Sequence, residues 1–238
     1  MTTLLTMKGF NKKIDYLCFT ANAANSSVKL AKNGSPTAVT LETSTDGNTW
    51  STYTFGSTIT LANVWDKIYW RNTSETTTWF SKSASHYYQF VTTWSIAASW
   101  DINYLLNKNS TTTLVSDYCY NNLFYWCKLT TAPKLTATTL TIYCYYQMFT
   151  DINSLETLPE LPATTLMAHC YEFMFGYCPK IKLSTTQTWE YQTEYRIPKI
   201  GTGTGAVSEL DNMFYNTWWT FTWTPSINTT YYTSNTLV

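Results

Sequence analysis

The chain has 238 residues, of which 17% are aromatic and only 13% are charged, and its formal net charge is zero. This length allows one large domain or two small ones with a buried core. A nucleic-acid partner is disfavoured because there is no surplus of Lys and Arg to neutralise phosphates, and the aromatic content argues against disorder and favours β structure.

The sequence gives no sign of a membrane anchor. No apolar run reaches the roughly 18–20 residues that span a bilayer, so we expect no membrane insertion. The first residues also lack a basic segment ahead of a long apolar stretch, which is the pattern of a standard secretory signal. A protein of this kind that acts outside a cell would travel within a larger particle, such as a virion, or by another route.

Residues 1–93 contain short alternating apolar and polar stretches separated by turn residues. The pair Asp46-Gly47 predicts a hairpin, because a type I′ turn needs positive φ at both central residues. Strands at this spacing are typical of an immunoglobulin-like sandwich. The predicted strands are 14–20, 27–32, 38–44, 50–55, 58–61, 67–71 and 87–92.

Residues 94–238 repeat themselves. Phe124, Phe149 and Phe175 are 25 and 26 residues apart, and each follows a Cys-Tyr or Cys-Tyr-Tyr segment. A looser copy ends in Phe214, a decayed one covers 101–106, and a Gly-rich insertion is expected near 184–208. A period of this length predicts stacked units that share one core. Within a unit we expect a short helix or 3₁₀ turn at the Cys-Tyr segment, then a short extended strand.

These units resemble the 26-residue repeat of bacterial and phage surface proteins, a relative of the BspA-like leucine-rich repeats. The family pattern is roughly Cys-Tyr-x-x-Met-Phe-x-Gly-Cys-x-x-Leu-x-x-Ala-Pro-x-Leu-Pro-Ala-Thr-Thr-Leu, and residues 143–178 and 118–140 match it best. The resemblance implies a mainly β fold, with an N-terminal immunoglobulin-like β-sandwich (1–93) followed by a leucine-rich-repeat-like solenoid of strands and short helices (94–238). It also implies an adhesive or structural role at a cell or virion surface, without catalytic residues.

Tryptophan replaces glycine in several turn-like contexts. The chain has 11 Trp and only 8 Gly, where average usage predicts roughly 17 Gly. One hypothesis is that some of these residues are glycines whose UGA codons were read under the wrong code, and absence of UGA from the gene at those positions would refute it. The other is that they are genuine aromatic residues of a binding surface. The positions concerned are Trp65, Trp94, Trp100, Trp126, Trp218, Trp219 and Trp223.

Catalytic and metal motifs are absent from the sequence. His86 and His169 do not have a metal-binding spacing, and His169 takes the place that Tyr has in neighbouring units. The cysteines are not spaced as zinc ligands, so we expect no metal and no cofactor. A column of buried thiols in the stacked units is favoured over disulfides within units.

Recurring tyrosines are the best candidates for a binding surface, because Tyr combines a large contact area with a polar tip. The alternative is that half of them face the core and the rest are spacers. We therefore expect a non-enzymatic module that binds a glycan or a protein through the repeats, with self-association left open. The first alternative is a structural or decoration protein of a phage particle, and a remote one is a carbohydrate-active enzyme. The candidate binding residues are Tyr118, Tyr120, Tyr143, Tyr145, Tyr146 and Tyr171.

Overall fold

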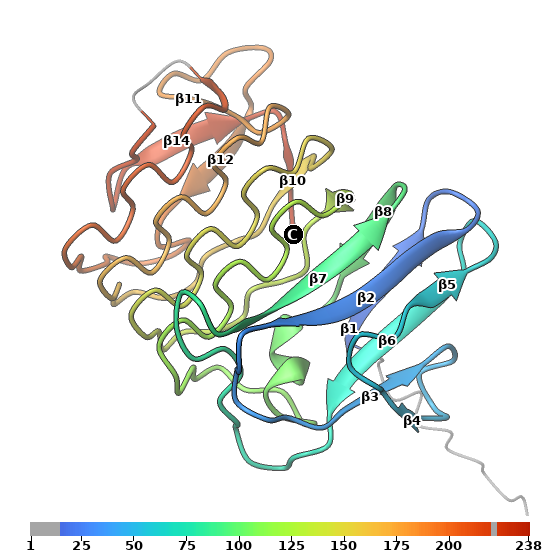
Figure 1. The fold of residues 1–238 in the computed structure, drawn as a ribbon. Helices are drawn as coiled ribbons and strands as arrows, with labels where there is room; N and C mark the ends of the chain where they lie inside the picture. Colours follow the sequence, from blue (N-terminus) through green and yellow to red (C-terminus); the bar gives the residue numbers. More distant parts are fainter. Residues whose placement is uncertain (1–14, 220–222) are drawn as a thin grey trace, which may run out of the picture.

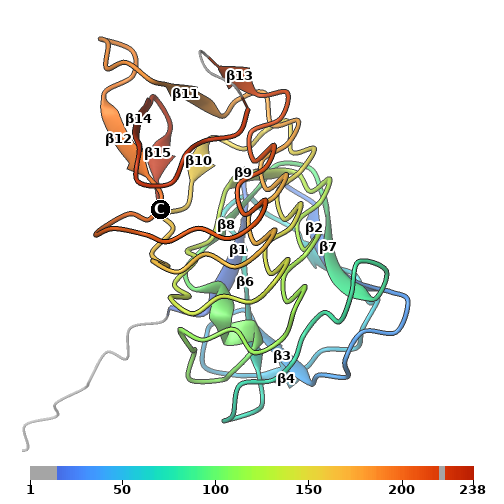
Figure 2. The same ribbon diagram turned by 90° about the vertical axis from the view of Figure 1, so that its left-hand side faces the viewer.

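A computed structural model of the chain describes residues 15–219 and 223–238, without the side chains of residues 218 and 219 (Figures 1 and 2). The fold is mainly β, as the composition predicts. Strands β1 to β15 are joined by turns, and the 3₁₀-helix η1 (Ile102–Leu105) is the one helix among the described residues.

The first part of the chain forms two sheets whose inward side chains meet. One has the strand order β4-β3-β6-β1-β8-β9 and the other β5-β2-β7. Phe19 of the first sheet packs on Phe90 of the second with ring centroids 4.8 Å apart. All seven predicted strands are confirmed, and β8 was not predicted. The strands are β1 (Leu17–Ala21), β2 (Ser26–Asn33), β3 (Leu41–Ser44), β4 (Ser51–Thr52), β5 (Ile59–Leu61), β6 (Lys67–Asn72), β7 (Tyr87–Thr93) and β8 (Ile96–Ser99).

The hairpin between β3 and β4 lies where Asp46-Gly47 predicts it, but its turn differs from the expected type. Gly47 has a positive φ of 72°, whereas Asp46 has none. The Asp46 carboxylate instead accepts hydrogen bonds from the backbone N–H groups of Asn48 (2.8 Å) and Thr49 (2.7 Å). A side chain that satisfies the backbone in this way closes a longer loop than a type I′ turn.

The larger sheet continues into the repeats. Strand β9 (Leu129–Thr131) pairs in parallel with β8, and the carbonyl of Thr130 accepts from the N–H of Glu156 (2.9 Å) in the next unit. Strand β12, from the predicted insertion, joins a sheet of order β12-β14-β11-β13, and β10 pairs with β15. Their bounds are β10 (Thr157–Leu158), β11 (Lys182–Ser184), β12 (Thr193–Arg196), β13 (Trp218–Trp219), β14 (Thr230–Thr233) and β15 (Thr236–Leu237).

Four loops stack beside these strands, and Figure 2 shows them lying side by side. We call them the ridge loops, residues 118–127, 143–152, 169–178 and 208–217. Successive N–H groups alternate in their partners: one donates to a carbonyl of its own loop, and the following one donates to a carbonyl of the next loop. In the first, the N–H of Leu123 donates to the carbonyl of Tyr120 (3.2 Å), and the N–H of Phe124 donates to that of Met148 in the second (3.0 Å). Backbone groups in this region therefore find partners without regular secondary structure.

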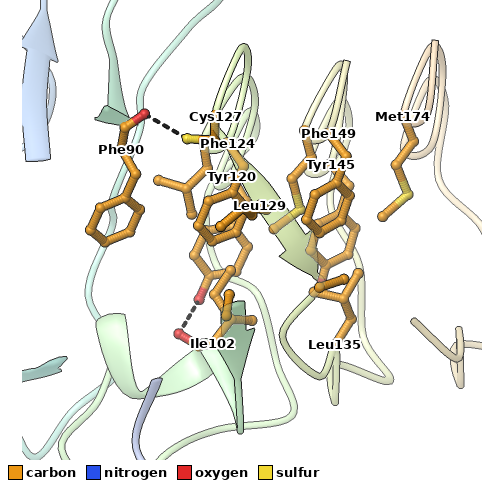
Figure 3. Packing of buried hydrophobic residues seen from close by; sticks show 14 of the residues in the cluster. Phe90, Ile102, Tyr120, Phe124, Cys127, Leu129, Leu135, Tyr145, Phe149 and Met174 are labelled. Carbon is orange, nitrogen blue, oxygen red and sulfur yellow. Dashed lines mark hydrogen bonds between the residues drawn. The ribbon is translucent and has the colours of Figure 1, made fainter. Parts of the chain in front are cut away.

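A column of phenylalanine rings runs through the core of the stack (Figure 3). Phe90, Phe124, Phe149, Phe175 and Phe214 lie one above the other, with successive centroids 5.4–5.5 Å apart and planes within 10° of parallel. Since Phe90 belongs to β7, the column joins the three-stranded sheet to the ridge loops. One continuous cluster of buried apolar side chains results. The looser copy that ends in Phe214 is thus a regular member of the stack.

Of the two structures expected at the Cys-Tyr segment, the helix is wrong, whereas the hydrogen bonds within the segment join residues three apart, as in a 3₁₀ turn. Residues 118–127 form successive hydrogen-bonded turns of four residues. Their inward side chains recur in pairs, Cys119 with Tyr120 and Leu123 with Phe124. A spacing of four residues is close to the 3.6 residues of a helical turn, so the apolar pattern alone does not separate the two.

The prediction of buried thiols without disulfides is confirmed, and Cys119, Cys144 and Cys170 take the same place in successive loops. All six are free and buried. Cys127 donates to the carbonyl of Phe90 (3.0 Å), and Cys178 donates to that of Phe149 (2.9 Å). Burial raises the pKa of Cys119, Cys127 and Cys178 to about 12. These thiols act as small apolar core residues.

Four of the seven questioned tryptophans have left-handed backbones. Their φ angles are 75° at Trp65, 58° at Trp94, 66° at Trp100 and 61° at Trp126. Residues 63–66 form a turn in which the N–H of Asp66 donates to the carbonyl of Asn63 (3.3 Å). Trp65 is the third residue of this turn, where a positive φ makes glycine the preferred residue. Trp223 directly follows residues outside the description, so its φ is not assigned. Trp218 and Trp219 form β13, and their side chains lie outside the description.

We expect Trp65→Gly and Trp94→Gly each to stabilise the protein by about 1 kcal/mol. Glycine removes a left-handed strain of about 1–2 kcal/mol, partly offset by its larger entropy when unfolded. The side chains are 72% and 66% exposed, so little packing is lost. Urea unfolding measures the change in the free energy of unfolding. Trp79→Gly is the control, because Trp79 is not among the residues of positive φ and glycine should be destabilising there. If both variants lose as much stability as the control, the glycine hypothesis is contradicted.

We expect none of the five buried cysteines of the repeats to react with an aromatic disulfide reagent at pH 8 while the protein is folded. Thiolate is the reactive form, and burial both raises the pKa and blocks access. Absorbance at the released thiolate counts the thiols before and after adding denaturant. Rapid labelling of a repeat cysteine in the native protein would show that the stack opens locally.

Candidate binding face

Residues of positive φ recur at one in every four positions of the ridge loops, and all of them except the buried Asn122 are at least partly exposed. They form three columns across the four loops, with φ between 51° and 62°, and none of them is glycine. The first column is Tyr118, Tyr143, His169 and Ser208, the second Asn122, Gln147, Phe173 and Asn212, and the third Trp126, Asp151, Tyr177 and Asn216. The sequence analysis missed the last two columns. The spacing of four and the frequent Asn and Asp, which tolerate this conformation, could have revealed them.

Three of the six candidate tyrosines do not reach the surface. Tyr120, Tyr145 and Tyr171 are at most 1% exposed and stack inside the core, parallel to the phenylalanine column. The Tyr120 hydroxyl donates to Oδ1 of Asn103 (3.0 Å). For these three residues the alternative that half of the tyrosines face the core is confirmed, and each of them follows an inward cysteine.

Tyr118, Tyr143 and Tyr146 lie together at one edge of the ridge and are partly exposed. Tyr118 stacks on Tyr143 (4.7 Å, 8°), and Tyr143 stacks on His169 (4.3 Å, 3°). His169 thus continues the tyrosine column as the sequence predicts. Parallel rings this close cover one another's faces, so the column presents ring edges and hydroxyls to solvent. Binding at these three residues stays a prediction.

A second group of aromatic side chains gathers at the other edge. Tyr215 contacts Phe173 (5.6 Å, 56°), Tyr177 (5.3 Å, 69°) and Trp223 (4.8 Å, 62°). We call these four residues the aromatic patch. Tyr177 is 41% and Trp223 37% exposed. Because the rings are inclined to one another, they do not cover each other's faces as the parallel column does.

The side of the repeats that carries β9 and β10 is hollowed by small furrows. One, of about 270 Å³, is lined by Lys134, Thr136, Glu160, Pro162 and Lys199, among others. Lys199 and Glu160 form an ion pair. The charges that line this furrow therefore partly neutralise each other, and its small volume suits no large ligand.

Two carboxyl groups line a neighbouring hollow, which the sequence analysis did not bring together. Asp15 and Asp101 both face it, and burial raises the pKa of Asp101, to which the Asp15 charge adds. Asp101 accepts from Ser110, from the Thr136 hydroxyl (2.8 Å) and from the N–H of Asn103 (3.0 Å), where it caps η1. These bonds account for Asp101 as a structural residue.

Within residues 15–219 and 223–238 there is no cluster of three or more His, Cys, Asp or Glu side chains placed to hold a metal ion. Nor does this part of the chain contain a helix of the length and apolarity that a membrane span requires. The candidate face is therefore defined by aromatic and amide side chains.

Comparison with known proteins gives no relative. No family model, no curated protein and no solved structure matches this chain. The resemblance to the 26-residue surface-protein repeat stays a prediction from the sequence.

We expect Tyr145→Phe and Tyr120→Phe to differ in their effect on stability. The buried Tyr145 hydroxyl has no hydrogen-bond partner among the described residues, whereas that of Tyr120 bonds to Asn103. Losing the Tyr120 bond destabilises by about 1 kcal/mol, while removing an unpaired hydroxyl is neutral or stabilising. Denaturant unfolding of both variants measures this. Equal destabilisation would contradict the assignment of Tyr145 as an unpaired core residue.

Proposed function

We propose that this chain is a non-enzymatic binding module of a cell or virion surface. Its architecture would be an immunoglobulin-like sandwich that continues into a leucine-rich-repeat-like solenoid. The observation that carries the proposal is the difference between the inward and the outward positions of the ridge loops. Inward positions repeat the same residue types, as in Phe124, Phe149, Phe175 and Phe214, whereas the outward columns differ from loop to loop. A rigid repeated core with varied outward side chains is the arrangement that repeat proteins use for binding.

The balance of positive and negative side chains favours a partner that is recognised through short-range contacts. Lys and Arg together number 15, as do Asp and Glu. Five Lys and Arg side chains of the described residues are paired with carboxylates, for example Arg71 with Glu42 (2.8 Å) and Lys182 with Glu190 (3.4 Å). Long-range steering needs an excess of one sign. Recognition by aromatic contact and hydrogen bonding fits this surface better than attraction to an anionic polymer.

A structural subunit of a phage particle is the second candidate, and exposed apolar side chains in the inserted segment favour it. Trp189 is 86% exposed, Ile200 72% and Val207 67%. Large apolar side chains at a surface are often buried by a neighbouring subunit. In that case the insertion would carry the assembly contact.

The test of the binding function is an array of neutral and charged glycans probed with the purified full chain. We expect retention on at least one glycan class, with the protein monomeric by sedimentation velocity. Absence of binding together with concentration-dependent assembly would reject the binding module in favour of the structural subunit. Trp189→Ser separates the two roles, because it should weaken assembly and leave glycan binding unchanged.

A further inference from the structure

The aromatic patch differs from the parallel tyrosine column in what it offers to a ligand. Sugar rings bind through their C–H faces against the face of an aromatic ring, so a usable site needs ring faces that are not already covered. The planes in the patch meet at 56° to 69°, whereas those of Tyr118 and Tyr143 are 8° apart. Of the two partly exposed aromatic groups on the ridge, the patch is the one with the appropriate geometry.

Polar side chains surround the patch at neighbouring column positions. Asn212 and Gln147 flank Phe173 in the second column, and Asn216 and Asp151 flank Tyr177 in the third. Backbone bonds fix this adjacency, since the N–H of Phe173 donates to the carbonyl of Asp211 (3.1 Å), beside Asn212. The side-chain amides of Gln147, Asn212 and Asn216 are not seen to hydrogen-bond within the described chain. Amides offer both a donor and an acceptor, as sugar hydroxyls require.

The backbone gives a further reason to assign a role to these rings. Phe173 and Tyr177 have φ of 53° and 58°, a conformation that costs a bulky residue about 1–2 kcal/mol. Asn, which tolerates it, occupies the equivalent places in the next loop. Aromatic residues are thus held here against their conformational preference, which is a feature of functional positions.

We infer that the aromatic patch binds a neutral oligosaccharide, stacked on Tyr177 and Phe173 and hydrogen-bonded by the flanking amides. This rests on the proposed binding function and assigns it a site and a ligand class. No Lys or Arg belongs to the second and third columns, which carry the patch, and Asp151 is the one acid among their eight residues. A carboxylated or sulfated sugar would lack a cation there, so the chemistry favours an uncharged sugar.

The repeat itself supplies the test variants. Tyr177→Asn and Phe173→Asn place at each position the residue that the next loop carries there, so the left-handed backbone is kept. Titration of neutral oligosaccharides from the array, followed by calorimetry on the full chain, should show affinity lowered at least tenfold by either change. Trp189→Ser, which removes an exposed aromatic side chain outside the ridge loops, is the control and should leave affinity within twofold. Tyr143→Ser, which copies Ser208 in the first column, distinguishes the patch from the tyrosine column, because it would lower affinity only if the ligand bound the column.

Each contrary result is informative. Neutral-glycan binding that survives both patch variants, or that Tyr143→Ser abolishes, overturns the site and leaves the binding function standing. Binding to charged glycans alone overturns the ligand class. A dimer that dissociates in Tyr177→Asn would identify the patch as a contact between two copies of this chain and also overturn the inference. Absence of any glycan binding counts against both the site and the glycan form of the function.

Discussion

The rest of the structure depends on how the ridge loops satisfy their backbone. These loops are packed against a core, yet they form neither helix nor sheet, so every buried N–H and carbonyl still needs a partner. Alternating donation solves the problem: one N–H closes a turn within the loop and the following one bonds to the next loop, as Leu123 and Phe124 illustrate. The turn requires a left-handed residue every four positions. Each such residue other than glycine costs about 1–2 kcal/mol, which the stacked core must offset.

Stacking offsets this strain by repeating the same contact. Each phenylalanine between Phe90 and Phe214 packs against a parallel ring on either side, with centroids 5.4–5.5 Å apart. The first ring of the column belongs to β7. At the other end, the N–H of Phe214 donates to the carbonyl of Trp223. The sheets of the first part therefore cap a stack that would otherwise expose an apolar end.

Sequence patterns identified the elements whose signal is local. Strands β1 to β7 were predictable because their alternation and turn residues specify a pleated surface with one buried face. β8 was missed because Ile96 is the one large apolar residue of Ile96–Ser99, and the three small residues after it give no clear alternation. The repeat was recognisable, but the orientation of its tyrosines was not. Tyr120 and Tyr118 differ by two residues and would share a face in a strand, yet a turn of four residues places one in the core and the other at the edge.

The candidate site was harder to derive because it joins residues that share no motif. Phe173, Tyr177 and Tyr215 come from two loops and are neighbours only through the hydrogen bonds between loops, such as the 2.7 Å bond from the N–H of Tyr177 to the carbonyl of Tyr215. The same scaffold explains why such a site could vary. A column residue contributes little to the core, so its identity is limited mainly by tolerance of the left-handed backbone. Where the chain holds Phe and Tyr at positions that suit Asn, stability does not account for the choice, and we propose a role in recognition instead.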